Sequence, residues 1–471
     1  MRYSTARMPD ANPLRVAVTM RAPWHSAVAD AVIAECGLRN ADVFRIESSI
    51  NPQSAILNPQ YDVVVDLAGA AGSDVEPRLG VWRFGFGDGA PLADGAPGTC
   101  ARLYRVTPDP DRAVVLHDGW YRARTAEAWG TKSVGDRVAT WAARALRQIH
   151  LGDRALLDRA PQSIRGCSDP NPPESPPPLR AAAIDAADTV RSWLVRPRWT
   201  IGIVPLPVED IMDRGVLPEP AWLAGQPSDR FYADPFPLAD CGDRTRVLVE
   251  EYIYPSRIKR LVEIEISRSG ELRRRCDRAS LPRPASYPFL LRRDGRLFCV
   301  PETSGADRVS AFASDDGGGS WSPYRDLLTG FAVVDATLVE HDERWWMFCT
   351  KQADEDQTEL YLFSASDWPG PWQPHPLNPV KSDTRSSRPA GACFRIGGGL
   401  YRPAQNCARR YGAGLAINRI VDLSPRAFRE ETVLSLRPFE SSPWPHGMHT
   451  INAIAGVTIV DGLRVEPRIT R

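Results

Sequence analysis

The chain has 471 residues, which is too long for one hydrophobic core and favours two domains joined by a linker. Lys plus Arg equals Asp plus Glu at 58 each, so no overall charge attracts the protein to nucleic acid or to an acidic membrane. The N-terminus lacks a continuous apolar core before a small-residue cleavage site, and no run approaches the roughly eighteen apolar residues that span a bilayer. We expect a soluble protein that is not exported and has no integral membrane segment.

The cysteines give no sign of a metal site. There are nine, with no C-x-x-C pair and no spacing typical of metal ligands. Cys299 and Cys349 lie inside strand patterns and are expected to be small buried hydrophobes. The sequence therefore predicts no metal, no cofactor and a reducing, cytoplasmic location.

The N-terminal part alternates strand and helix patterns. A buried strand is expected at 14–20 and a helix at 23–37, with Pro early in the helix and Gly at its end. The Val63–Val65 run within 61–67 is typical of a sheet covered on both faces. Further strands are expected at 43–47, 80–87, 101–106 and 113–116, and an amphipathic helix at 132–149. The pattern predicts a Rossmann-like α/β domain over 13–150.

A change of composition marks the domain boundary. Between 163 and 178 the chain is rich in Pro, Ser and Asp, including the run PNPPESPPP, which favours an extended spacer. One more helical stretch is expected at 179–195. We therefore predict a linker with a helix over 151–198.

The second half of the chain repeats a strand pattern about every fifty residues. Four times, a strand that begins with a polar or aromatic residue is followed by a second polar side chain at the end of an apolar run. The pairs are Asp234 with Glu251, Tyr287 with Glu302, Asp335 with Lys351, and Arg388 with Gln405; a fifth such strand begins at His449. This period, with short β-rich runs and no amphipathic helices, is typical of β-propeller blades. The count predicts an all-β, five-bladed propeller over 199–465.

Propeller geometry would bring these side chains together. The first strand of a blade lines the central channel and the second returns beside it, so both members of each pair are expected in one funnel. Asp294-Gly295 and the glycines at 397–399 supply tight turns between first and second strands.

Asp234 and Asp335 are the leading catalytic candidates, because each opens an inner strand and they stand two predicted blades apart. Glycosidic cleavage uses one carboxylate as base or nucleophile and one protonated carboxylic acid for the leaving oxygen. Glu302 or Glu251 is the candidate acid. The alternative is structural, because an Asp at the start of a strand also caps turns and accepts hydrogen bonds from backbone amides.

Basic and polar residues complete the predicted funnel. An Arg can hold a carboxylate or phosphate in bidentate fashion, so the funnel would suit a sugar that bears phosphate or uronate. The alternative is an internal salt bridge from Arg388 to Asp234 or Asp335. The pair His446 and His449 is weak evidence for metal, and hydrogen bonding is expected of it. The predicted substrate-binding residues are Glu251, Tyr287, Lys351, Arg388, Gln405, Arg409, His449 and Asn452.

Five segments carry a family resemblance: FYADPFP, VDATLVEHDERWWMF, SRPAGACF, YRPAQNCARRYG and HTINA. They resemble the N-terminal domain of plant glucosamine inositolphosphorylceramide transferase and its bacterial relatives, over roughly 199–461. No segment resembles the glycosyltransferase domain that follows in the plant enzyme, which puts that activity in doubt.

A more distant resemblance links the motifs ADP at Asp234 and VDA at Asp335 to the five-bladed arabinanase, levansucrase and invertase superfamily. It implies that Asp234 is base or nucleophile and that Asp335 orients or tunes the acid. The superfamily's third motif, an acid Glu in a later blade, has no clear counterpart. The assignment of Glu302 as acid therefore rests on geometry.

The segments YDVVVDLAG and GVWRFGFGD resemble the formyltransferase fold of methionyl-tRNA formyltransferase and sugar N-formyltransferases. Those enzymes carry Asn and His on the strand that corresponds to 80–87, where this chain has Arg83, Phe84, Gly85 and Phe86. Without them a formyl transfer lacks its proton shuttle and oxyanion donor. The resemblance implies a degenerate domain, kept for scaffolding or recognition.

Together these patterns predict a carbohydrate-active protein whose funnel binds, and hydrolyses or transfers, the sugar of a glycan or glycolipid precursor. One alternative is a non-catalytic glycan-binding module. Another is a formyltransferase that acts on an amino sugar. No nucleic-acid partner is expected.

Overall fold

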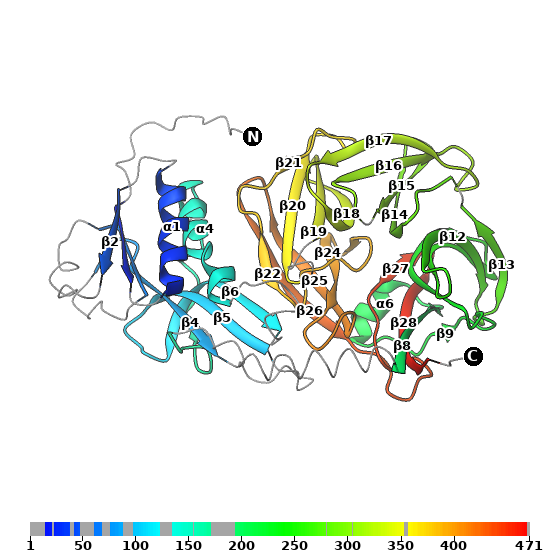
Figure 1. Ribbon diagram of the computed structural model, residues 1–471, viewed down its shortest axis with the longest axis horizontal. Coiled ribbons are helices and arrows are strands. Elements are labelled where there is room, and N and C mark those ends of the chain that lie inside the picture. The colour runs from blue at the N-terminus through cyan, green and yellow to red at the C-terminus, as the bar shows by residue number, and fades with distance from the viewer. Residues whose placement is uncertain are drawn as a thin grey trace. The chain divides into compact units, whose positions relative to one another are not determined.

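Figure 1 shows a computed structural model of the protein, which describes residues 15–20, 23–37, 42–47, 61–67, 76–87, 98–122, 134–153, 155–170, 194–278, 280–303, 305–352 and 357–468. The chain divides into two compact units by its internal contacts. The N-terminal unit comprises 1–91, 98–119 and 130–175, and the C-terminal unit comprises 92–97, 120–129 and 176–471.

The N-terminal unit is built on one mixed sheet with strand order β6-β5-β4-β3-β1-β2. Strand β1 runs parallel to β2 and to β3, and β3 runs parallel to β4, whereas β5 is antiparallel to β4. The predicted strands are confirmed, with bounds β1 Arg15–Met20, β2 Asp42–Glu47, β3 Val63–Asp66, β4 Val81–Gly87, β5 Gly98–Val106 and β6 Arg112–Arg122. The valines of β3 are fully buried, as expected for a covered strand.

Three helices are described in this unit. Helix α1 (Pro23–Gly37) has the predicted bounds, but the single helix predicted at 132–149 is wrong, because α3 (Val134–Val138) and α4 (Trp141–His150) are separated at Ala139 and Thr140. The helix predicted at 179–195 lies outside the described residues, except for its last two. Among the residues that the structure describes, no helix has the length and apolar character needed to cross a membrane.

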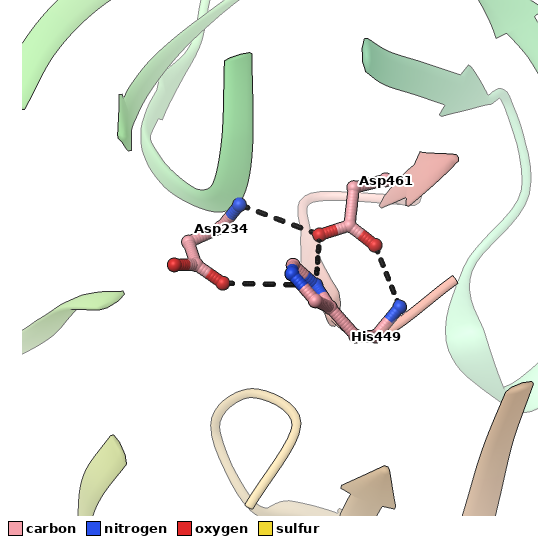
Figure 2. Close-up of side chains that lie close together, drawn as sticks. All are labelled: Asp234, His449 and Asp461. Carbon is pink, nitrogen blue, oxygen red and sulfur yellow. Dashed lines mark hydrogen bonds and ion pairs between the residues drawn. The ribbon is translucent and has the colours of Figure 1, made fainter. Parts of the chain in front are cut away.

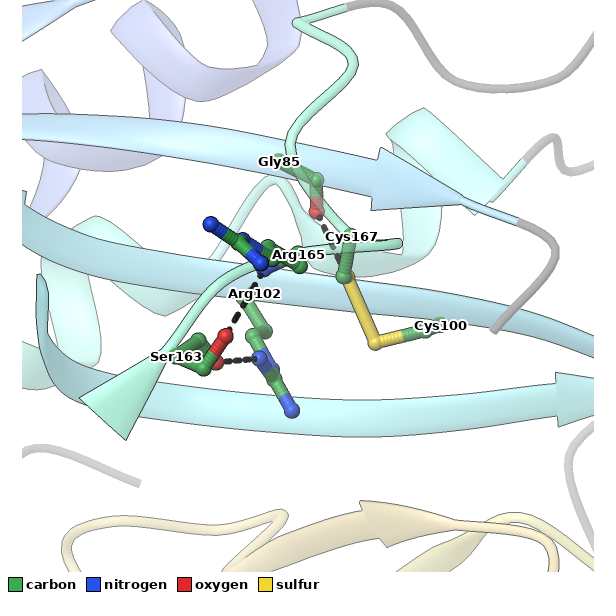
Figure 3. Close-up of a disulfide and its surroundings, with 6 residues drawn as sticks. All are labelled: Gly85, Cys100, Arg102, Ser163, Arg165 and Cys167. Carbon is green, nitrogen blue, oxygen red and sulfur yellow. Dashed lines mark hydrogen bonds between the residues drawn. A yellow bond between two sulfur atoms is a disulfide. The ribbon is translucent and has the colours of Figure 1, made fainter. Parts of the chain in front are cut away.

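The segment that follows the short strand β7 (Gln162–Ser163) contacts β4 and is joined to β5 by a disulfide (Figure 3). Phe86 and Asp169 form an antiparallel bridge, and Cys167 forms a disulfide with Cys100 of β5. A Cβ atom on Gly85 would overlap the carbonyl oxygen of Cys167. Gly85 and Gly87 of β4 thus permit close backbone contact here.

The C-terminal unit consists of antiparallel four-stranded sheets in a propeller-like arrangement (Figure 1). We name each by its first strand. The β10 sheet has β10 (Arg230–Asp240), β11 (Arg244–Ile253), β12 (Ile258–Ser267) and β13 (Leu272–Asp277), and the β14 sheet has β14 (Ser286–Arg293), β15 (Arg296–Glu302), β16 (Arg308–Ser314) and β17 (Ser322–Thr329). The β23 sheet has β23 (Phe394–Ile396), β24 (Gly399–Asn406), β25 (Gly414–Leu423) and β26 (Phe428–Leu436).

Two further arrays belong to this unit. The β27 sheet combines β27 (Ile451–Ile454) and β28 (Val457–Pro467) with β8 (Val195–Val204) and β9 (Ala221–Trp222). The β18 array has β18 (Val333–His341), β19 (Arg344–Lys351) and β20 (Glu359–Ala365), and two short strands, β21 (Gln373–Pro374) and β22 (Lys381–Asp383), both pair with β20. Because β8 pairs with β28, residues more than 250 positions apart in the sequence close one sheet. A short helix, α6 (Val208–Arg214), connects β8 to β9.

Tight turns set the register between first and second strands. Two-residue turns with positive φ at both positions connect them in the β14, β18, β23 and β27 arrays, including the predicted Asp294-Gly295 turn. Such turns match the right-handed twist of the strands that they join. In the β18 array the turn is Asp342-Glu343, which contains no glycine and is not visible as a turn signal in the sequence.

Apolar clusters pack between successive arrays. One joins the β10 and β14 sheets, one the β14 sheet and the β18 array, and one the β18 array and the β23 sheet. Two more join the β23 sheet to the β27 sheet and the β27 sheet back to the β10 sheet. The packing therefore returns to its starting sheet, and Cys299 and Cys349 are buried within it as predicted.

The packing between the sheets leaves no room for a Cβ atom at Gly391. Its φ is +132°, and a Cβ atom there would overlap the carbonyl oxygen of Ile451 in the neighbouring sheet. We expect Gly391→Ala to lower the free energy of unfolding by at least about 3 kcal/mol, measured by denaturant unfolding.

Gly398 provides the matched control, because its φ is also positive (+82°) but open space surrounds its Cβ position. We expect Gly398→Ala to cost only about 1 to 2 kcal/mol. Equal losses in the two variants would contradict the importance of the contact with Ile451.

Candidate functional site

Three equivalent bulges bring the leading candidates to the inner ends of neighbouring sheets. The registers of β10, β14 and β18 with their second strands each shift by one residue, directly after Ala233, Ser286 and Val334. The first residue of each bulge is Asp234, Tyr287 or Asp335, with φ of 51°, 41° and 54°. Positive φ is uncommon for non-glycine residues and a true outlier for a bulky one such as Tyr. Strain of this kind clusters at functional sites.

Asp234 belongs to a buried ion-pair cluster with His449 and Asp461 (Figure 2). The Oδ2 atom of Asp461 lies 2.5 Å from His449 Nδ1, and Asp234 Oδ1 lies 3.7 Å from the same nitrogen. Asp234 accepts hydrogen bonds from the Tyr287 backbone N–H (3.1 Å) and the Thr450 hydroxyl (3.0 Å). These contacts connect the β10, β14 and β27 sheets.

His449 is held as a cation by this cluster. Its ring stacks on Trp199 with centroids 3.9 Å apart, and it is 3% exposed. Burial disfavours the charged imidazole, but the charge and hydrogen bond of Asp461, with Asp234, outweigh it and raise the pKa of His449 to about 9.

The same three residues are the only described group of His, Cys, Asp and Glu that meets the geometric requirement for a metal site. One ligand atom from each lies within 4.8 Å of the others. A metal would need the lone pair of Nδ1, which the imidazolium form of His449 donates as N–H to Asp461. We therefore interpret the group as an internal ion-pair cluster.

Tyr287 connects three sheets through its backbone and its hydroxyl. The hydroxyl lies 2.8 Å from Thr337 Oγ1 and accepts a hydrogen bond of 2.7 Å from the Gly391 backbone N–H. The side chain is fully buried, and its ring packs edge-on against Phe236. Burial raises the pKa of Tyr287 well above its usual value, so it is a neutral hydrogen-bonding group.

Asp335 forms the internal salt bridge that was the structural alternative for Arg388. Arg388 Nε donates to Asp335 Oδ2 at 2.6 Å, and Gln405 Nε2 donates to the same oxygen at 3.0 Å. Burial raises the pKa of Asp335 and the Arg388 guanidinium opposes the shift. Arg388 also lies 5.0 Å from the centre of the Tyr411 ring. The structure thus brings together Asp335, Arg388 and Gln405.

Two glutamates join the aspartates to form what we call the inner acidic cluster, made up of Asp234, Glu250, Glu302 and Asp335. Glu250 and Asp335 each interact electrostatically with both Asp234 and Glu302. Glu250 is 7% exposed, whereas Glu302 is half-buried. Lys259 faces the cluster, and its Nζ lies 3.9 Å from Glu250 Oε1.

The structure does not bring Glu251 to this cluster. Its carboxylate contacts Arg230, Arg260 and Arg275 instead, and these arginines hold its pKa at about 2 against the effect of burial. Glu250, the adjacent residue, lies opposite Ala233 and points to the other face of the strand.

Three other predicted binding residues have different surroundings. Lys351 is exposed, with its ammonium 5.5 Å from the centre of the Phe331 ring, and Arg409 is also exposed. Asn452 is buried between sheets: it donates to the Pro235 carbonyl and accepts from the Ala392 backbone N–H, both at 2.8 Å. Asn452 therefore contributes to the joining of sheets.

Sequence reasoning missed Glu250, Lys259, Thr450 and Asp461. The run VLVEEYI contains Glu250 and Glu251 in succession, and only the register of the strand pair decides which of them faces Asp234. Asp461 lies within the apolar run VTIVDGL. An isolated acidic residue in such a run is a sequence signal that could have indicated a buried functional carboxylate.

Comparison with known proteins supports one family. Residues 283–443 match the family described as glucosamine inositolphosphorylceramide transferase 1, N-terminal. The transferase of that name from rice (Oryza sativa subsp. japonica) is 28% identical over 153 residues, which cover 31% of this chain and 20% of the relative. The one from Arabidopsis thaliana is 26% identical over 174 residues, covering 36% and 22%. The chain thus spans about a fifth of the length of these relatives.

Solved structures show weaker likenesses. Zg3597, a family 117 glycoside hydrolase from the marine bacterium Zobellia galactanivorans, is 12% identical with a TM-score of 0.37, covering 58% of this chain and 91% of that one. The GH43_1 enzyme from Xanthomonas citri is 10% identical with a TM-score of 0.38, covering 55% and 92%. At these TM-scores we infer neither activity nor substrate from the likeness.

The raised pKa of His449 predicts a loss of stability at alkaline pH. The unfolded imidazole has its ordinary pKa of about 6.5, so the cation's contribution is complete below that pH and disappears as the pH rises towards 9. We expect this contribution to be on the order of 3 kcal/mol. Denaturant unfolding of the wild type and of His449→Gln between pH 6 and 9 measures it, and the slope should be smaller in the variant.

His375 is the matched control, because burial lowers its pKa to about 4 and it stays neutral across this range. Only the unfolded His375 imidazole titrates here, near pH 6.5, so the pH slope of His375→Gln should equal that of the wild type between about pH 7.5 and 9. An unchanged slope in His449→Gln would show that the imidazole is neutral in the folded protein.

Proposed function

We propose that the C-terminal unit is a five-bladed propeller, over 199–465, that binds the sugar of a glycan or glycolipid precursor and cleaves or transfers it at the inner acidic cluster. The arrays named for β10, β14, β18, β23 and β27 would be the blades. The family match supports the substrate class, since the plant relatives are named as glucosamine inositolphosphorylceramide transferases.

The observation that carries the proposal is the gathering of carboxyl groups and cations at the inner ends of these arrays. Four acidic side chains interact there with Lys259, Arg388 and His449. Buried charge is costly unless it is compensated, and a fold that needs only packing gains little from it. A carboxylate also offers about four lone-pair sites, so Asp234 and Asp335 can accept further hydrogen bonds from sugar hydroxyls.

The groups have the chemistry that a glycosidic bond requires. In the proposed mechanism Asp234 is the base or nucleophile, Asp335 tunes the neighbouring acid, and a glutamate of the cluster protonates the leaving oxygen. Such a mechanism needs acidic groups in unlike environments. Asp234 is held by the His449 cation and backbone amides, whereas Glu250 is buried with Lys259 at 3.9 Å.

The test uses purified protein and a panel of oligosaccharides, nucleotide sugars and aryl glycosides, including those of glucosamine. We expect a ligand that raises the melting temperature of the wild type and a product that the wild type releases. Asp234→Asn and Asp335→Asn, which keep shape but remove charge, should lower turnover by about 10² to 10⁴-fold.

Glu431→Gln removes an exposed surface charge, and this variant controls for nonspecific effects. Undiminished turnover in both aspartate variants would contradict a catalytic role.

A non-catalytic glycan-binding module is the second candidate. It is favoured by the contacts of Asp234 and Asp335, because each carboxylate is already engaged by the protein itself. This candidate predicts ligand binding without a new product, which the same panel distinguishes.

For the N-terminal unit we propose a formyltransferase-like scaffold or recognition domain over 13–150, to which β7 and the Cys167 segment of the predicted linker (151–198) add contacts. The parallel strands β1, β2, β3 and β4 with α1 support this proposal. The segment of Cys167 pairs with β4 at Phe86, on the strand where the resembling enzymes carry Asn and His. Binding of a folate would support instead the alternative of a formyltransferase acting on an amino sugar.

We also propose a cytoplasmic location, against which the Cys100–Cys167 disulfide of the structure counts if it forms in cells, so this pair provides the test. Disulfides are rare in the cytoplasm, so a cytoplasmic protein should carry these two cysteines as thiols. Alkylation in intact cells before peptide mass spectrometry should then label both. Recovery of the cross-linked peptide as the main species would contradict the cytoplasmic location.

A further inference from the structure

We propose that Glu250, rather than Glu302, is the carboxylic acid that protonates the leaving oxygen of the bound glycoside. This inference rests on the proposed function, and it names the acid within that site. It follows from the place of Glu250 in the repeat, from its lack of hydrogen bonds and from the charges that face it.

Glu250 and Glu302 occupy equivalent places in two sheets. Glu250 lies opposite Ala233, and Glu302 lies opposite Ser286, each at the last regular pair before the bulge. The bulge residue beside Glu250 is Asp234, whereas the one beside Glu302 is Tyr287. Glu250 is therefore the glutamate that shares a bulge with the proposed base.

The carboxyl group of Glu250 is buried but has no hydrogen-bond partner within the described part of the chain. The residue is 7% exposed, and its one close charged neighbour is Lys259, at 3.9 Å, which is longer than a hydrogen bond. A buried carboxyl left in this state is costly unless it is protonated or a ligand supplies the missing partner. Glu251, on the opposite face, shows the contrast, since three arginines contact it.

The charged groups around Glu250 come from four elements. Lys259 belongs to β12, Asp234 to β10, Glu302 to β15, and His449 to the segment before β27. Burial raises the pKa of Glu250 to about 8, with help from Asp234 and Glu302 and against the effect of Lys259 and His449. A carboxyl group in this environment holds its proton at neutral pH, as a general acid must.

The proposed step is a balanced hydrolysis. The bond between the anomeric carbon and the leaving oxygen breaks, and its electron pair goes to that oxygen. The oxygen takes the proton of Glu250, while a water molecule attacks the anomeric carbon and gives a proton to Asp234. Lys259 stabilises the carboxylate that Glu250 becomes, and transfer of the proton from Asp234 through solvent restores both groups.

The first experiment measures the ionisation of Glu250 without any ligand. Protein labelled with [5-13C]glutamate is titrated by NMR, and the resonance missing from Glu250→Gln assigns the carboxyl group. We expect this resonance to titrate near pH 8. Titration with the ordinary glutamates, at about pH 4 to 5, would overturn the proposal.

Glu263→Gln is the matched control for this measurement. Glu263 is a buried glutamate of the same sheet, but Arg246 and Arg278 contact it, and these contacts outweigh burial and lower its pKa. The resonance missing from Glu263→Gln belongs to the Glu263 carboxyl group. In the wild type this resonance should stay constant between pH 6 and 9.

The second experiment compares phenyl and 2,4-dinitrophenyl glycosides of the sugar that the wild type cleaves. Phenolate is a poor leaving group and needs a proton, whereas 2,4-dinitrophenolate leaves without one. Glu250→Gln should lose about 10² to 10⁴-fold on the phenyl glycoside and much less on the dinitrophenyl one. The alkaline limb of the pH–rate profile on the phenyl glycoside should disappear in this variant. Glu302→Gln should affect both substrates alike.

The possible results separate the two proposals. If the wild type cleaves a glycoside but Glu302→Gln shows the leaving-group dependence and Glu250→Gln does not, Glu250 is not the acid and the proposed function stands. If the wild type cleaves none of the glycosides in the panel, the catalytic function fails and the donor role of Glu250 fails with it.

Discussion

The carboxylate of Asp461 is the contact on which the C-terminal unit and its site both depend. One oxygen accepts the backbone N–H groups of His449 and Thr450, and the other accepts that of Asp234 and lies 2.5 Å from His449 Nδ1 (Figure 2). Asp461 lies on β28, whose other neighbour is β8. A single buried side chain thus fixes the junction of the first and last sheets and places Asp234 beside its cation. Hydrogen bonds to charged groups contribute about 1.5 to 3 kcal/mol each, so this junction is well determined.

The sequence was sufficient to predict the β-rich repeat, most strands and the places of Asp234, Tyr287 and Asp335, because local strand patterns and turns carry that information. It was not sufficient for their partners. Each bulge adds one residue to a first strand, and side chains alternate between faces, so a shift of one residue changes which neighbour faces inward. Glu250 replaces Glu251 for this reason. Likewise Thr350, rather than Lys351, lies at the last regular pair before the bulge in the β18 array.

Contacts between residues far apart in the sequence were the second feature that the sequence could not predict. Asp461 and β8 are far from Asp234 in the sequence, and no periodic pattern announces their meeting. Asp335 illustrates the same point within the site. Its pairing with Arg388 was one of two alternatives that the residue types allowed, and only the packing of the β18 array against the β23 sheet decides between them.

The three bulges also show how a repeated scaffold acquires a site with unlike groups. The positions opposite Ala233, Ser286 and Val334 are equivalent, yet they hold a buried glutamate, a half-buried glutamate and a threonine. The Oγ1 atom of Thr350 has no hydrogen-bond partner among the described residues. Because the backbone geometry is the same in each case, the differences in charge and burial come from the neighbours. The repeated backbone places the side chains at equivalent positions. The different residues at and around those positions give the carboxyl groups the unequal acidities that acid–base chemistry requires.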